Sequence, residues 1–187
     1  MGIKHKSFTL IELIVAVGVV GFVLPSVFNI FFTMIRQQLI LVSYQEMKQQ
    51  GDSIERNIKN ILQTRTAYLT DSLYATNNPC PLFTTPTPTF SPEMYIRDRN
   101  EYGIKLYQKT VSGVDTIASD SADRNNSFLK TYNLSSKDVL VSDFGYSCFK
   151  VNDYSLPFVT TTFTMHKSTV FTDMVLPYSF KLQLRNY

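Results

Sequence analysis

Residues 4–35 read KHKSFTLIELIVAVGVVGFVLPSVFNIFFTMI, and the rest of the chain is organised around them. A short basic leader runs directly into an apolar segment, and the only ionisable side chain between Phe8 and Ile35 is Glu12. At about 1.5 Å of rise per residue, these 28 residues would reach about 42 Å as a helix. A hydrocarbon core is about 30 Å thick, so the stretch predicts a membrane-spanning helix.

Glu12 is the exceptional residue of this segment. A carboxylate inside a membrane span costs at least about 2.5 kcal/mol on insertion scales, so residues of this kind mark functional sites. We therefore take Glu12 as the first candidate site residue.

Two simpler interpretations of the segment stay open. A cleaved secretory signal peptide has an apolar region of about 7–15 residues and ends at a cleavage site of small residues. The segment here is longer, lacks such an end and carries an acid near its start. A plain signal anchor, in which Glu12 has no role, is the second alternative.

Residues 4–7, followed by FTLIELI at 8–14, resemble the leader and helix start of type IV pilins and of type II secretion pseudopilins. The resemblance implies that a prepilin peptidase cuts between Ser7 and Phe8 and then methylates the new amino terminus. Glu12 would become the fifth residue of the mature chain. The family usually has Gly before the cut, where this chain has Ser7. The resemblance covers about the first 30 residues.

The resemblance also implies a function and partners. The chain would be a structural subunit, more a minor than a major one, of a pilus-like filament or a secretion pseudopilus. Its partners would be the prepilin peptidase, other pilin or pseudopilin subunits, an inner-membrane assembly platform and the lipid bilayer. The carboxylate of Glu12 would meet the amino terminus of a neighbouring subunit and fix the axial register. Adhesive or twitching pili, DNA-uptake pili and secretion pseudopili all stay open.

The charge pattern indicates the membrane topology. Lys4 and Lys6 precede the first apolar residue, which favours a cytoplasmic N-terminus and places everything after Arg36 outside the cytoplasm. The formal net charge is +3, from 18 basic and 15 acidic residues. Without the two leader lysines the balance is nearly even, and no basic face is concentrated anywhere. Direct binding of nucleic acid is therefore not expected.

The chain contains two cysteines, Cys80 and Cys148. Outside the cytoplasm, disulfides form and persist. We expect a bond between the two, which would close a long loop and add about 4 kcal/mol of stability in the chain-entropy model. Two free buried thiols are the alternative.

The helix is expected to continue beyond the membrane segment, in two parts at 8–35 and 36–66. Gly21 and Pro25 interrupt the apolar part, and Pro25 has no N–H to donate, so we expect a kink or local opening there. The second part is amphipathic, with a stripe at helical spacing. That stripe comprises Ile40, Tyr44, Met47, Ile54, Ile58, Ile61 and Leu62.

The remaining residues, 67–187, predict a β-rich extracytoplasmic head. Five of the eight prolines lie in 70–92, which indicates a loop. Alternation around Ile104, with a turn at Ser112-Gly113, predicts a hairpin. The polar residues 118–127 are expected to form a loop. Further strands are expected at 128–132, 139–151, 158–165 and 180–184. One long helix followed by strands indicates an α+β fold with an antiparallel sheet packed on the helix.

The sequence offers no catalytic constellation. It contains no phosphate-binding loop, no GxSxG motif and no cluster of metal ligands, so neither a cofactor nor a metal is expected. The aspartates at 115, 120 and 123 match no defined calcium loop and favour a solvated turn. His166 would need a nucleophile brought to it by the fold. Besides the structural subunit, we therefore keep a membrane-anchored binding or adhesion module that does not polymerise, and more distantly an anchored enzyme.

Overall fold

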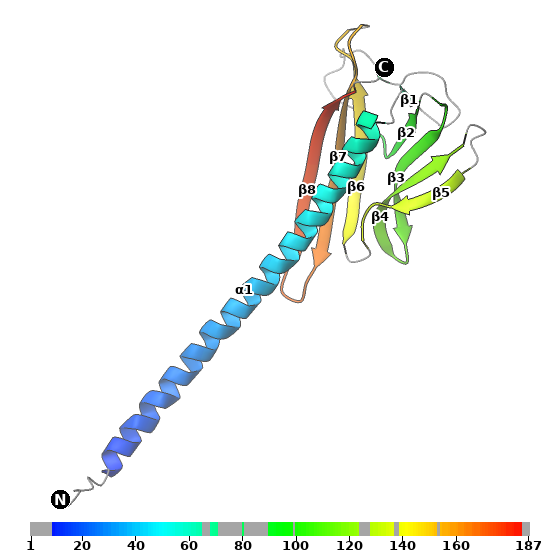
Figure 1. The fold of residues 1–187 in the computed structure, drawn as a ribbon. Coiled ribbons are helices and arrows are strands. Elements are labelled where there is room, and N and C mark those ends of the chain that lie inside the picture. Colours follow the sequence, from blue (N-terminus) through cyan, green and yellow to red (C-terminus); the bar gives the residue numbers. More distant parts are fainter. Residues whose placement is uncertain are drawn as a thin grey trace, which may run out of the picture. The chain divides into compact units, whose positions relative to one another are not determined.

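The computed structural model describes residues 9–64, 68–70, 80, 90–98, 100–123, 128–136, 139–152 and 154–184. One long helix precedes two antiparallel sheets, which makes the fold α+β (Figure 1). The elements are α1 (Leu10–Thr64), β1 (Tyr68–Thr70), β2 (Glu93–Arg97), β3 (Gly103–Val111), β4 (Val114–Ala122), β5 (Phe128–Asn133), β6 (Leu140–Phe149), β7 (Phe158–Ser168) and β8 (Asp173–Gln183).

The chain divides into two compact units, Met1–Val42 and Ser43–Tyr187. Every side chain described between residues 9 and 39 of the first unit is exposed. Within the described residues, α1 is the one helix long and apolar enough to cross a membrane, and its most apolar window has a mean hydropathy of 2.4. It is therefore a candidate membrane span.

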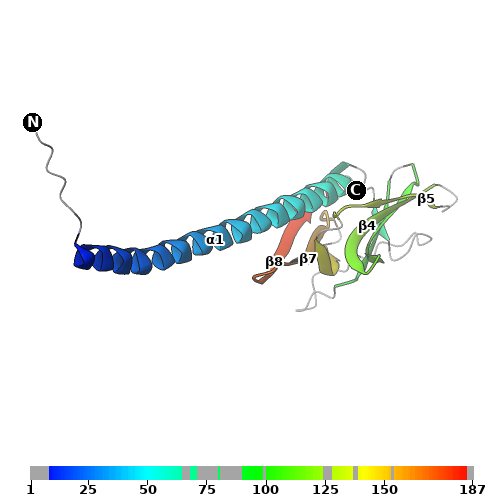
Figure 2. The same cartoon turned by 90° about the horizontal axis from the view of Figure 1, so that it is seen from below.

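The helix is continuous through Gly21 and Pro25. Pro25 removes one backbone donor, while the hydroxyl of Ser26 donates to the carbonyl oxygen of Phe22 at 3.0 Å. No local opening interrupts the helix at these positions, and its blue N-terminal part curves gradually in Figure 2.

The first sheet has five strands in the order β1-β2-β3-β4-β5. Val111 pairs with Val114 across the turn at Ser112 and Gly113, which confirms the predicted hairpin. Both turn residues have positive φ, 54° and 81°, a backbone region that Gly113 adopts without steric cost. The strands β1 and β2 were not predicted.

The loop predicted at 118–127 is wrong over its first half. Strand β4 continues to Ala122, and Ser119, Asp120 and Ser121 pair with both β3 and β5. Polar residues point to both faces of this strand, so no alternation of polar and apolar residues marks it in the sequence. The predicted strand at 128–132 is confirmed as β5.

The second sheet has three strands in the order β6-β7-β8, where the sequence predicted a single sheet for the whole head. A register shift between Ser142 and Gly145 interrupts the pairing of β6 with β7. Strand β8 starts well before the predicted 180–184 and contains Pro177. Because β8 is an edge strand, a proline there breaks no interior ladder.

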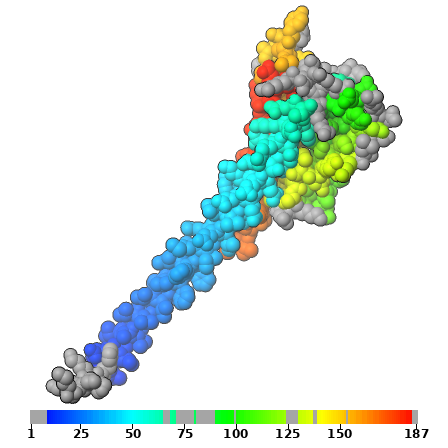
Figure 3. Space-filling view, viewed as in Figure 1, coloured from blue at the N-terminus to red at the C-terminus, as the bar shows by residue number. Residues whose placement is uncertain are grey.

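The second half of α1 supplies part of the core of the Ser43–Tyr187 unit. Its buried residues are Met47, Gly51, Ile54, Ile58 and Leu62. They pack in one cluster with residues of both sheets, among them Leu106 and Phe163. Figure 3 shows this cyan part of α1 with the green and yellow-green strands beside it. The predicted stripe is confirmed for these apolar positions, whereas Tyr44 is 42% exposed.

Candidate functional site

Thr9 and Glu12 form a reciprocal cap at the start of α1. The backbone N–H of Thr9 and its hydroxyl both donate to Oε2 of Glu12 at 3.0 Å. The backbone N–H of Glu12 in turn lies 3.4 Å from Oγ1 of Thr9. This is a capping box, with Thr9 as the N-cap and Glu12 as the third helical residue. The carboxylate therefore satisfies one backbone donor of its own helix end, and the Thr9 hydroxyl satisfies another.

The cap leaves one carboxylate oxygen of Glu12 available. Oε2 accepts both bonds from Thr9, and Oε1 has no hydrogen bond to any other described residue. The N-terminal end of a helix carries a partial positive charge, which favours the ionised acid at this position. A cationic group from another molecule could therefore approach Oε1 without breaking the cap.

The surface around Glu12 is apolar and uncovered. Leu10, Ile11 and Phe22 are 78%, 71% and 84% exposed. Exposed apolar area of this extent needs lipid or other helices to cover it. The expected cleavage site, Ser7 and Phe8, lies outside the described residues.

A disulfide joins Cys80 to Cys148 on β6, which agrees with the expected pairing. The two residues are separated by 68 positions, so the bond closes most of the first sheet into one loop. Nearly all of the expected loop at 70–92 lies outside the described residues.

The fold brings His166 to a hydroxyl, a contact that the sequence left undetermined. Oγ of Ser142 on β6 lies 2.7 Å from Nε2 of His166 on β7 and donates to Oδ2 of Asp143, also at 2.7 Å. A hydroxyl has one proton to give. When Ser142 donates that proton to Asp143, it accepts a hydrogen bond from the Nε2–H of His166.

Two of the three aspartates weighed for calcium lie in β4 and not in a turn. Asp115 accepts hydrogen bonds from Thr110 and Gln108. Within the described residues, no group of three or more His, Cys, Asp or Glu side chains is placed to hold a metal ion.

No family model matches the chain, and neither a curated protein nor a solved structure matches it.

Glu12 was identified from the sequence as a site residue, whereas its partner Thr9 was not. The signal was readable, because a Ser or Thr three residues before a Glu, at the start of an apolar run, is the pattern of a capping box.

Proposed function

We propose that the chain is a structural subunit, more specifically a minor pilin or pseudopilin, of a type IV pilus-like filament or secretion pseudopilus. One observation carries the proposal. A single continuous helix is fully exposed and apolar in its first part, apart from the capped Glu12, and its last part is built into the core of a β-rich head. A subunit that moves from a membrane into a filament needs both properties in one element.

The assembly step follows from the same helix. In the membrane, lipid would cover the exposed apolar side chains; in a filament, the helices of neighbouring subunits would cover them. Head-to-tail repetition of one helix contact produces an open helical assembly and not a closed ring. The free oxygen of Glu12 would accept the amino terminus of the next subunit and set the axial step.

The test is the identity of the mature amino terminus. We expect mass spectrometry of filaments sheared from cells to show a chain that begins with N-methylated Phe8. The leader, cut after Ser7 by a prepilin peptidase, would be missing. Recovery of an intact leader from assembled material would refute the processing step.

The same preparation of sheared filaments distinguishes the structural subunit from the alternative function. A membrane-anchored binding or adhesion module would stay in the membrane fraction and would be missing from sheared filaments, whatever its N-terminus. It would also work without cleavage. The structural-subunit proposal fails if the chain is never found in filaments.

A further inference from the structure

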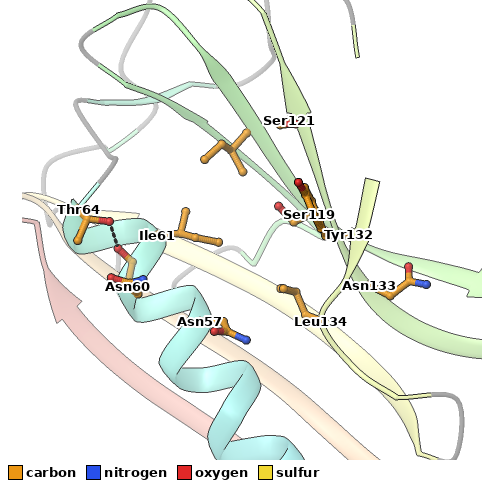
Figure 4. A pocket seen from close by; sticks show the side chains of 10 residues that line it. Asn57, Asn60, Ile61, Thr64, Ser119, Ser121, Tyr132, Asn133 and Leu134 are labelled. Carbon is orange, nitrogen blue, oxygen red and sulfur yellow. Dashed lines mark hydrogen bonds between the residues drawn. The ribbon is translucent and has the colours of Figure 1, made fainter. Parts of the chain in front are cut away.

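A cavity of about 360 Å³ lies between the end of α1 and the inner face of the five-stranded sheet, inside the Ser43–Tyr187 unit (Figure 4). One wall comes from the helix, through Asn57, Ile61 and Thr64. The other comes from the sheet and includes Ser119 and Tyr132. Ligand pockets in proteins have volumes of about 300–1,000 Å³, so this one can hold a small molecule.

The strand register places the lining residues of the sheet on one face, and the helical repeat does the same for those of α1. Ser119 of β4 is the direct partner of Tyr132 of β5, so both side chains stand on the same face of the sheet. Asn57 and Ile61 are one helical turn apart and share one face of α1. Polar groups on two different elements thus converge on one space.

Among the described residues, the lining contains polar side chains but no carboxylate, ammonium, guanidinium or imidazole group. The side-chain amide of Asn57 has no hydrogen bond to another described residue. An amide offers two donor hydrogens and an acceptor oxygen, and the hydroxyls of Ser119 and Tyr132 can each donate and accept. A neutral ligand that carries several groups able both to donate and to accept matches these side chains.

The pocket also has an apolar part and an aromatic ring. Ile61, Ile104 and Leu134 supply aliphatic surface. Tyr132 is 50% exposed, and Nζ of Lys130 lies 4.7 Å from its ring centroid. The exposed part of the Tyr132 ring offers an aromatic surface on which an aliphatic C–H surface can stack.

We propose that this cavity binds a neutral sugar ring, as a free saccharide or as the terminal unit of a glycan. A pyranose has hydroxyls that both donate and accept around its edge and a C–H face suited to an aromatic ring. In this assignment, Asn57 and Ser119 bind hydroxyls and Tyr132 stacks on the C–H face. The proposal does not depend on filament assembly, because every residue that carries it lies in the Ser43–Tyr187 unit.

The test uses the full chain in lauryldimethylamine oxide, a detergent without a sugar headgroup. Saturation-transfer NMR would be recorded with glucose, galactose, mannose and N-acetylglucosamine, and with inorganic phosphate as the charged probe. We expect at least one sugar, and not phosphate, to receive saturation. Asn57→Ala and Tyr132→Ala should each weaken that sugar's affinity by about tenfold or more, as the loss of one well-formed contact does.

Gln49→Ala is the matched control, because Gln49 is an exposed amide on the same helix that does not line the cavity. It should leave the affinity unchanged. Asn57 and Tyr132 are both exposed, so their removal takes nothing from the core, and Ser119→Ala provides a third variant. The proposal is overturned if none of the four sugars receives saturation, if phosphate competes with the sugar, or if the Asn57 and Tyr132 variants bind like wild type.

Discussion

The ring of Tyr178 on β8 lies directly against the backbone of α1 at Gly51, so closely that a Cβ at Gly51 would overlap its Cζ, Cε2 and Oη atoms. The hydroxyl of Tyr178 donates towards the carbonyl oxygen of Lys48 at 3.0 Å and lies 3.2 Å from Oδ1 of Asp52. Its ring stacks on Phe163 with centroids 4.9 Å apart. Gly51 lowers helix propensity, and the structure shows that its missing side chain allows this contact.

Gly51→Ala is therefore expected to destabilise the head, although Ala favours a helix by about 1 kcal/mol over Gly. Tyr178 cannot easily move away, because it stacks on Phe163 and its hydroxyl proton is shared between the Lys48 carbonyl and the Asp52 carboxylate. Overpacking of this kind costs about 1–3 kcal/mol. Denaturant unfolding of the full chain in detergent measures the net loss. Gly18→Ala is the control, since a Cβ at Gly18 meets nothing within 4 Å. A more stable Gly51→Ala chain would contradict the packing argument.

Tyr178→Phe keeps the ring and removes only the hydroxyl. Because the bonds to Lys48 and Asp52 are lost and their acceptors are left with fewer partners, we expect a loss of about 1–2 kcal/mol in the free energy of unfolding. Denaturant midpoints of the variant and wild type measure it. Equal midpoints would show that water replaces the hydroxyl without cost.

The comparison of wild type with Tyr178→Phe also gives a prediction about pH. Burial raises the pKa of Tyr178 well above its ordinary value, and the negative charge of Asp52 and the hydrogen bond to it add to the shift. The folded pKa is thus higher than the unfolded one, so this contribution to stability is complete below about pH 10 and is lost as pH rises further. The advantage of wild type over Tyr178→Phe should stay constant up to about pH 9 and shrink as pH rises from about 10 upwards. A difference that stays constant across this range would contradict the shift.

A further prediction concerns how much the disulfide adds to the free energy of unfolding. Cys80 and Cys148 are 68 positions apart, and the chain-entropy model assigns about 4 kcal/mol to a loop of this length. The variant with Cys80→Ser and Cys148→Ser should lose stability of that order in unfolding measurements, and non-reducing peptide maps of wild type should show the linked pair. Free alkylation of both thiols in the native protein would contradict the bond.

Local signals in the sequence were sufficient for much of the fold. The helix was expected to end at residue 66 and ends at Thr64. The hairpin at Ser112-Gly113 was predicted from its turn chemistry, and the stripe ending at Leu62 from its helical spacing. Each of these features depends on residues that are close together in the chain.

Features that depend on distant pairing were missed. Strand β1 pairs with β2 across more than twenty residues, and no local alternation marks a strand of three residues. The role of Gly51 requires Tyr178, and the cavity requires Ser119 to face the same way as Tyr132. Sequence periodicity cannot supply such a register, because it is set by the sheet and not by neighbours in the chain.

The last prediction separates two roles of Glu12. The structure gives it a local one, since its carboxylate caps the helix through Thr9. The proposed function gives it a second, as the acceptor for the amino terminus of a neighbouring subunit. Glu12→Ala removes both roles, whereas Glu12→Gln can keep the cap, because Gln serves at this position of a capping box, and removes only the charge.

If charge pairing sets the axial step, Glu12→Gln and Glu12→Ala should both enter filaments poorly, because a neutral amide attracts a cationic amine far less than a carboxylate does. If the cap is what matters, Glu12→Gln should enter like wild type and Thr9→Ala should fail with Glu12→Ala. Tagged variant and wild-type chains expressed in the same cell, with their ratio measured in sheared filaments, give the answer directly. Normal entry of Glu12→Ala would remove both roles, and the register would then depend on the apolar helix surface alone.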